Sequence, residues 1–303
     1  MENSAIITKI LNKLESGKSV PLSELTTMLM GVYAKICARQ TPAGLLKQYE
    51  ENCFAKPSHL SPIKLNMQEH ALYNMAEEHG ISPVLLSPAA LLGSCSSVAA
   101  VSQNKVLSAI RGTEILADPT NMLALHICNE IKHGRLVSKE PVHLCASSRV
   151  VRGQKFGRKD LVQHFSIFGM VSAGRDQGSY GFEAACLVKH IAFYKNFFSA
   201  NFKAPISLTI RKRKGYSDLD GLVSRMQEKL INDLPGLSVK VDDEPSDNEY
   251  YTGLQFTLYA HINEENVTIG DGGFVDWSKK LLGQKKERML ISAIGIDRLC
   301  QFR

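Results

Sequence analysis

The sequence lacks the paired cysteines, the long apolar runs and the strong charge imbalance that mark several large classes of protein. Its seven cysteines are an odd number and include no Cys-x-x-Cys pair, so we expect neither a disulfide framework nor a structural zinc site. No stretch approaches the roughly 18 to 20 apolar residues that span a bilayer, and no basic segment precedes an apolar core at the N-terminus. We therefore expect a cytoplasmic protein with reduced, mostly buried thiols and no membrane contact.

The composition that is present is that of an ordinary globular protein. Of the 303 residues, 44% are hydrophobic and 22% are charged, which excludes a disordered chain because a packed core can form. The formal net charge of +6 permits contact with a polyanion without requiring it. The one dense basic run, residues 211–214, is explained either as a solvated strand end or as a phosphate-binding patch.

Hydrophobic periodicity divides the chain into a helical N-terminal part and a mixed remainder. Residues 4–38 carry apolar side chains at helical spacing in two runs, separated by Gly17 and Pro21, which predicts two amphipathic helices. Residues 43–64 are less regular. We take residues 1–60 as a helical N-terminal extension and residues 61–303 as the main domain.

The main domain is predicted to be an α+β fold, a mostly antiparallel sheet flanked by helices. Two strands at 142–151 and 164–172 form a hairpin with a long basic loop. The other predicted strands cover 81–86, 206–210, 237–241, 253–262, 266–269 and 289–295, and the helices cover 67–79, 118–133, 182–198 and 219–231.

Three segments, in this order along the chain, carry a more specific pattern. The first is Arg-Val-Val-Arg-Gly-Gln-Lys-Phe-Gly-Arg at 149–158, followed by Gln-His-Phe at 163–165. The second is Tyr-Tyr-Thr-Gly at 250–253 with Gly-Gly-Phe-Val-Asp at 272–276, and the third is Ser-Ala-Ile-Gly-Ile-Asp-Arg-Leu at 292–299. Over about residues 67–303 they resemble the catalytic core of class II aminoacyl-tRNA synthetases. The histidyl-tRNA synthetase branch, which includes the regulatory subunit of ATP phosphoribosyltransferase, is the most similar.

The resemblance implies a site that activates a carboxylate with ATP and Mg²⁺. Such a transition state spreads negative charge over phosphate oxygens, and arginine binds phosphate through a planar fork that stays charged. By the resemblance, Arg152 is the catalytic arginine that faces the α-phosphate, and Arg298 is the one that reaches the γ-phosphate and borders the adenine. Phe165 would stack on the adenine, and Gln154 would keep a hydrogen bond in the nucleotide site.

The same resemblance places polar residues around a pocket for the acid substrate. These candidate substrate-binding residues are Arg111, Glu114, Glu183, Tyr250, Tyr251, Thr252, Gly253 and Asp276. It also implies a homodimer through the segment around Pro88. The sequence assigns no metal ligands.

The departures from the family pattern weaken the recognition of histidine. The arginine four residues before the Tyr-Tyr pair of histidyl enzymes is Ser246 here, and the glutamine and glutamate that hold histidine correspond to Ile167 and Val171. The Arg-Pro-Glu-x-Thr element appears only as residues 111–114, with its carboxylate shifted by one. Because the chain stops about five residues after Arg298, we expect no anticodon-binding domain. A substrate other than histidine, held by fewer polar partners, is therefore expected.

Three functions stay open at this point. The first is an enzyme that adenylates an amino-acid-like carboxylate and passes the acyl group to a carrier protein, an amine or another acceptor that is not cognate tRNA. The second is a regulatory or binding paralogue that keeps the fold without the chemistry and acts through a partner enzyme. The third is a tRNA-acting fragment that needs a separate anticodon-binding chain. A mechanism through Cys145, His143 and His164 is set aside because their spacing carries no nucleophile signature.

Overall fold

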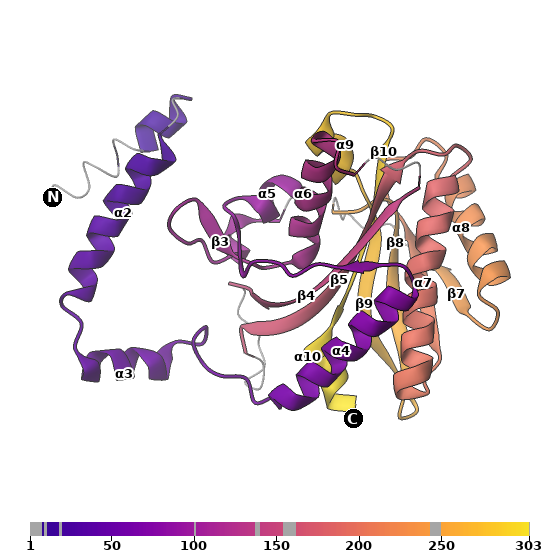
Figure 1. The fold of residues 1–303 in the computed structure, drawn as a ribbon, viewed down its shortest axis with the longest axis horizontal. Coiled ribbons are helices and arrows are strands. Elements are labelled where there is room, and N and C mark those ends of the chain that lie inside the picture. The colour runs from indigo at the N-terminus through magenta and orange to yellow at the C-terminus, as the bar shows by residue number, and fades with distance from the viewer. Residues whose placement is uncertain are drawn as a thin grey trace.

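An eight-stranded sheet forms the centre of the computed structural model, which describes residues 8, 11–17, 20–99, 101–136, 140–153, 162–242 and 250–302 (Figure 1). The strands of this sheet are β1 (Ser82–Pro83), β4 (Val142–Val151), β5 (His164–Arg175), β6 (Ile206–Lys212), β7 (Ser238–Asp242), β8 (Thr252–Ile262), β9 (Glu265–Val275) and β10 (Glu287–Gly295). Their spatial order is β1-β4-β5-β10-β9-β8-β6-β7. A separate two-stranded sheet pairs β2 (Ala89–Leu91) with β3 (Thr113–Ile115).

The main sheet is antiparallel except at its two edges. β1 pairs in parallel with β4, and β7 pairs in parallel with β6, whereas β4-β5-β10-β9-β8-β6 are all antiparallel neighbours. The mostly antiparallel sheet flanked by helices is thus confirmed.

Helices cover both faces of the sheet and give it two cores. The helices are α2 (Leu22–Cys37), α3 (Pro42–Glu51), α4 (Pro62–Glu78), α5 (Ser94–Val98), α6 (Pro119–Lys132), α7 (Gly181–Phe202), α8 (Leu219–Asp233), α9 (Trp277–Leu282) and α10 (Ile296–Leu299), with short 3-10 turns η1 (Gln103–Lys105) and η2 (Cys300–Phe302). The α4, α7 and α8 helices pack on one face, and α6 and α9 pack on the other. Alternation along β5 serves both cores, because Phe168 and Met170 belong to the first and Val171 and Ala173 to the second.

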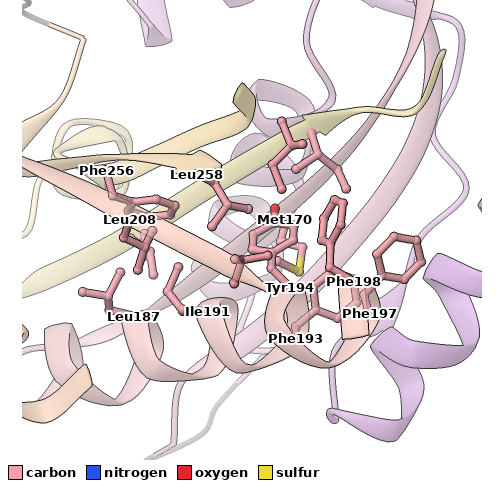
Figure 2. Packing of buried hydrophobic residues seen from close by; sticks show 14 of the residues in the cluster. Met170, Leu187, Ile191, Phe193, Tyr194, Phe197, Phe198, Leu208, Phe256 and Leu258 are labelled. Carbon is pink, nitrogen blue, oxygen red and sulfur yellow. The ribbon is translucent and has the colours of Figure 1, made fainter. Parts of the chain in front are cut away.

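The larger core is built around the aromatic side chains of α7. Phe193, Tyr194, Phe197 and Phe198 are fully buried there (Figure 2). The rings of Phe193 and Phe197 stack with their centroids 6.2 Å apart. A helix with apolar residues on most of its circumference needs cover on several sides, which the sheet, α4 and α8 provide.

The N-terminal helices α2 and α3 stand away from the sheet, and neither helix contains a buried residue (Figure 1). The sequence predicted a helix where α2 lies, but it missed α3. The missed signal is a capped start: Pro42 occupies the first turn, and the Thr41 hydroxyl accepts a hydrogen bond from the Gly44 amide at 3.1 Å. Part of the first predicted helix lies outside the described residues, and the boundary at residue 60 stays a prediction.

Strand β9 is longer than the segment 266–269 that the sequence predicted. Glycine usually weakens a strand, so strand propensity did not predict that β9 continues through Gly270, Gly272 and Gly273. Here a side chain would collide with neighbouring groups, with the carbonyl oxygen of Ala293 at Gly270 and with the Phe256 ring at Gly272. The glycines therefore allow β9 to lie close to β10 and β8.

The cysteines and the helices bear on two expectations from composition. All seven cysteines carry thiols rather than disulfides, and Cys95, Cys128, Cys145 and Cys186 are buried. In the part of the chain that the structure describes, no helix combines the length and the apolar character that crossing a bilayer requires.

A chain of polar side chains crosses the larger core between the sheet and α7. The fully buried His190 ring lies 2.8 Å from the Ser172 hydroxyl through Nε2 and 2.8 Å from the Ser292 hydroxyl through Nδ1. His143 Nδ1 lies 2.6 Å from the same Ser172 hydroxyl. Burial, followed by the nearby Lys189 charge, lowers the pKa of His143 to about 4, and burial holds the pKa of His190 well below its ordinary value. Both rings are therefore neutral in the folded protein at pH 7.

We expect the free energy of unfolding to fall as the pH is lowered from 7 to 5. The unfolded histidines bind protons below about pH 6.5, whereas folded His143 does so only near pH 4. The stability present above pH 6.5 is therefore lost as the pH falls, by at most about 1.4 kcal/mol per pH unit for each histidine. Urea unfolding at several pH values measures this slope in the parent protein and in His143→Gln, with the exposed His261→Gln as control. Equal slopes in the parent and His143→Gln proteins would contradict the assignment.

Candidate functional site

A cavity of about 620 Å³ opens on the α6 face of the sheet. Its floor is made by β5, β9 and β10, and its walls by the first turn of α6, the segment around η1 and the Tyr-Tyr pair. A concave site of this size with mixed apolar and polar walls is typical of small-molecule binding. Of the predicted residues, the structure brings together Arg152, Phe165, Tyr250 and Tyr251 in this cavity.

Part of the cavity wall is cationic and aromatic. Arg152 follows directly after β4, and its guanidinium carbon lies 5.3 Å from the centroid of the Phe165 ring on β5. Its Nε donates a hydrogen bond to the Ala117 carbonyl oxygen at 3.3 Å, which helps to fix the side chain. Lys105 joins the same wall, and its carbonyl oxygen accepts a hydrogen bond from the Gly153 amide at 2.9 Å. Two cations and an aromatic face thus belong to the same wall, where cation–π and charge-assisted contacts with a ligand are possible by residue type.

The Tyr-Tyr pair also lines the cavity. The rings of Tyr250 and Tyr251 meet edge to face with their centroids 4.8 Å apart, and Tyr250 also contacts Trp277. Tyr251 packs over Gly273, where a Cβ atom would lie 2.7 Å from the ring. Burial raises the pKa of both phenols well above their ordinary values, so both are neutral hydrogen-bond donors at pH 7.

Asp271 on β9 lines the cavity beside Tyr251. Its carboxylate accepts hydrogen bonds from Tyr251 and Gln255. Gln255 is held in turn by Arg213, whose Nε and Nη2 atoms lie 3.0 Å and 2.6 Å from its Oε1. The Asp271 side chain is exposed to water in the open cavity, but many protein atoms lie close around its carboxylate. This burial, reinforced by the charge of Asp118, raises its pKa above the ordinary value in spite of the Tyr251 hydrogen bond and the Arg152 charge.

The first turn of α6 supplies three more polar groups. Asp118 caps the helix, with its Oδ1 accepting hydrogen bonds from the amide and hydroxyl of Thr120 at 2.9 Å and 2.7 Å. Its Oδ2 lies 3.5 Å from the Tyr250 hydroxyl. Asn121, the residue after Thr120, is buried in the cavity wall, and its Oδ1 has no hydrogen-bond partner among the residues that the structure describes.

Glu114 lies behind the wall rather than in it. Its carboxylate accepts hydrogen bonds from the Ser94 hydroxyl at 2.6 Å, the Gln103 amide at 2.8 Å and the backbone of Gly93 at 2.9 Å. Burial alone would raise the pKa of Glu114, but these hydrogen bonds outweigh it and hold the pKa below the ordinary value. Glu114 therefore orders α5 and η1 as an ionised acceptor.

Several residues that the sequence placed at the pocket lie elsewhere. Glu183 is on the α7 face of the sheet, where its Oε1 accepts hydrogen bonds from Tyr216 and from Arg288 at 2.9 Å and 3.1 Å. Asp276 pairs with Lys280 at the start of α9, at 2.9 Å. Arg111 is exposed beside α2, in a left-handed turn with φ of 68°. None of these three side chains lines the cavity, because Glu183 lies on α7 at the opposite face of the sheet, Asp276 begins α9, and Arg111 lies in the turn before β3.

The other predicted site residues also lie outside the cavity wall or outside the described residues. Thr252 and Gly253 begin β8 outside the cavity wall, and Gly253 faces Tyr216 and Leu222 on the α8 side of the sheet. Arg298 is exposed on α10, three positions after the wall residue Gly295, and is not itself part of the wall. Its contact with a nucleotide stays a prediction. Gln154 and the basic loop 155–159 lie outside the described residues.

Sequence reasoning missed Asp271, Asp118, Asn121 and Lys105. Asp271 had a usable signal, because it lies two and four residues before Gly273 and Val275 and so shares their face of β9. Asp118 was seen only as the start of a helix. No local sequence pattern predicted that Lys105 lines the cavity, because its loop contacts Gly153 only in the folded chain.

The fold is similar to that of several solved structures, although the sequence is not similar to known families. No protein-family model and no curated protein matches the sequence. Solved structures do match. A histidyl-tRNA synthetase of Staphylococcus aureus has 13% identity over 80% of this chain and 67% of its own, with a TM-score of 0.61. The ATP phosphoribosyltransferase regulatory subunit/histidyl-tRNA synthetase of Bacillus halodurans has 15% identity over 82% of each chain, with a TM-score of 0.62.

The protein has a class II synthetase-like fold. A histidine–tRNA ligase subunit from Alicyclobacillus acidocaldarius agrees, with a TM-score of 0.56 and 12% identity over 81% of this chain and 96% of its own. The resemblance to the catalytic core of class II aminoacyl-tRNA synthetases is thereby confirmed at the level of the fold. Because synthetases and a regulatory subunit share this class II synthetase-like fold, the fold alone does not separate catalysis from regulation.

We expect Glu114→Ala to lower the free energy of unfolding by about 1 to 3 kcal/mol, because it leaves several buried donors without an acceptor. Urea unfolding followed by circular dichroism measures the change. Glu228→Ala, which removes an exposed partner of Arg225, is the matched control and should change stability far less. A loss no larger than that of the control would show that Glu114 does not order this wall.

Proposed function

We propose that the protein binds ATP and an amino-acid-like carboxylic acid in this cavity and joins them as an acyl-adenylate. The observation that carries the proposal is the position of the Arg152 guanidinium beside the Phe165 ring in the cavity wall. An aromatic face suits a purine base, and a guanidinium suits phosphate oxygens. The acid would then occupy the part of the cavity lined by Tyr250, Tyr251 and Asp271.

The proposed step transfers the α-phosphate of ATP to the carboxylate. One carboxylate oxygen attacks the α-phosphorus, the bond from this phosphorus to the bridging oxygen of pyrophosphate breaks, and pyrophosphate leaves with the electron pair. Arg152 would stabilise the negative charge that develops on the phosphate oxygens. The apolar side chains of Ile167 and Ile291 in the wall would limit the access of water to the mixed anhydride.

Magnesium would accompany the nucleotide. Among the described residues, no group of three or more histidines, cysteines or carboxylates forms a ready metal site. Mg²⁺ bound with ATP needs only one or two protein carboxylates, because phosphates and water supply the other ligands. Asp118 and Asp271 are the carboxylates of the cavity wall that fit this requirement by type.

A second candidate function is that of a regulatory paralogue, which binds a small molecule and controls a partner enzyme. It is favoured by the exposed position of Arg298 outside the cavity wall, which leaves the wall with only one of the two predicted arginines. The Bacillus halodurans structure, whose name includes a regulatory subunit, has the same fold. A homodimer or an enzyme partner, a carrier-protein acceptor and tRNA binding all remain predictions.

We expect Arg152→Ala to weaken ATP binding about 10- to 100-fold, since it removes charge-assisted hydrogen bonds to phosphate. Arg298→Ala should have a smaller effect, because that side chain lies outside the wall. Calorimetric titration with ATP and Mg²⁺ measures the affinities, with the exposed Arg225→Ala as control.

A companion assay separates the two functions. ATP–pyrophosphate exchange across a panel of amino and carboxylic acids should be supported by at least one acid in the parent protein. ATP binding without exchange for any acid would favour the regulatory paralogue. The absence of ATP binding in the parent protein would remove the proposed enzyme.

A further inference from the structure

The α2 helix carries apolar side chains that its own chain leaves uncovered. It has 16 residues, none of which is buried, and it stands away from the sheet (Figure 1). Val32, Tyr33 and Ile36 in its second half are each about half exposed. A helix of this length is only marginally stable in water unless its apolar face packs against something. The exposed face of α2 therefore calls for a partner surface.

The apolar side chains of α2 form a narrow stripe with the spacing of a two-helix contact. Its members follow one another at alternating intervals of three and four residues, and they are Leu22, Leu25, Leu29, Val32 and Ile36. This repeat is the one by which two helices pack along a shared apolar seam. A seam of this kind fits one other helix.

The rest of the chain faces the first half of the stripe without sealing it. Leu25 and Leu29 line one side of a groove of about 480 Å³, and residues 108–112 line the other side. Val32 and Ile36 lie beyond the lining of this groove. The stripe is therefore accessible along its length, through the groove in its first half and directly from solvent in its second half.

The two charged side chains of α2 lie on the same flank of the stripe. Glu24 is in the first turn and Lys35 in the last, and both are exposed. Eleven residues separate them, which is about three helical turns, so they point in nearly the same direction. Neither forms an ion pair with another residue that the structure describes. The helix dipole favours each charge at its own end of α2, but it does not require that the two share a flank.

These charges make α2 complementary to a second copy of itself. An antiparallel partner helix that sets Leu29 opposite the partner's Val32 also brings Glu24 to within about 3 Å, along the helix axis, of the partner's Lys35. Two-fold symmetry repeats the same pair on the other half of the contact. A parallel pair would set Glu24 at the height of the partner's Glu24, where no opposite charge is available.

We infer that α2 pairs in antiparallel orientation with the α2 helix of a second copy of this chain, through the apolar stripe and two symmetric Glu24–Lys35 ion pairs. A second copy supplies both the matching seam and the matching charges. This surface is separate in sequence from the segment around Pro88, and the inference does not depend on the proposed function.

Charge reversal tests the pairing in the full-length protein. Sedimentation velocity at a series of protein concentrations should show reversible self-association. Glu24→Lys alone, or Lys35→Glu alone, should weaken this association about 10-fold, because each change replaces two attractive pairs with two repulsive ones. The double variant restores both pairs with reversed signs, so its association should return to within about 3-fold of the parent value. A general loss of helix stability would not be rescued in this way.

The controls separate this surface from any other. Ala34→Lys adds a charge on the opposite side of α2 and should leave the association unchanged, whereas Ile36→Lys places a charge in the stripe and should abolish it. Because no residue of α2 is buried, these variants should keep the fold, which circular dichroism verifies. A parent protein that does not self-associate, or association that Ile36→Lys leaves unchanged, would overturn the inference. Loss in both single charge variants without rescue in the double variant would also overturn it.

Disulfide trapping tests the orientation. In the antiparallel pair Leu25 lies opposite the partner's Ile36, whereas the two copies of Leu25 are about 16 Å apart along the axis, too far for a disulfide. In a Cys37→Ser background, which removes the exposed thiol of α2, the variant with both Leu25→Cys and Ile36→Cys should form a linked dimer on mild oxidation. Neither single variant should link. Linking by a single variant, or none by the double variant, would contradict the antiparallel arrangement.

Discussion

The close approach of β9 to its two neighbours is the constraint on which the rest of the structure depends. At Gly270 and Gly272 there is no room for a side chain, because the carbonyl oxygens of β10 and the Phe256 ring occupy that space. At Gly273 the Tyr251 ring takes the equivalent space on the opposite face. The same short run therefore closes the larger core on one side and forms the floor of the cavity on the other. Asp271, placed between these glycines, lies on the cavity floor because strand side chains alternate.

Buried polar groups are arranged in two connected chains, one on each side of the sheet. On the α7 side, the chain through Ser172, His190 and Ser292 satisfies its members internally, and burial keeps the histidine neutral. On the cavity side, the chain from Glu114 through the backbone amide and sulfur of Cys95 ends at Asn121, whose Oδ1 has no partner in the described part of the chain. A complete chain rigidifies a core, whereas an incomplete chain at a cavity leaves a position for a ligand. This contrast is why the cavity, and not the larger core, is the candidate site.

Much of the fold was accessible from the sequence, and the exceptions have physical reasons. The periods of helix and strand located α4, α6, α7, α8 and the β4-β5 hairpin, because burial on one face imposes a regular spacing of apolar residues. The α3 helix was missed because its apolar side chains are exposed, so no core-facing stripe marked it. The end of β9 was missed because its glycines were chosen by close backbone contacts and not by strand propensity.

The sequence by itself determined the helix and strand periods that predict a mostly antiparallel sheet, and the order of the three motifs, since each follows from residue type and spacing within one segment. The convergence of Arg152, Phe165 and the Tyr-Tyr pair was implied only by the family resemblance. Only the tertiary structure decided that Glu183 and Asp276 turn away from the cavity, that Glu114 lies behind its wall, and that Asp271 and Asn121 lie in it. These placements depend on which elements pack together across long separations in the chain. A local pattern fixes the face of a strand or helix on which a residue lies, and packing fixes what that face meets.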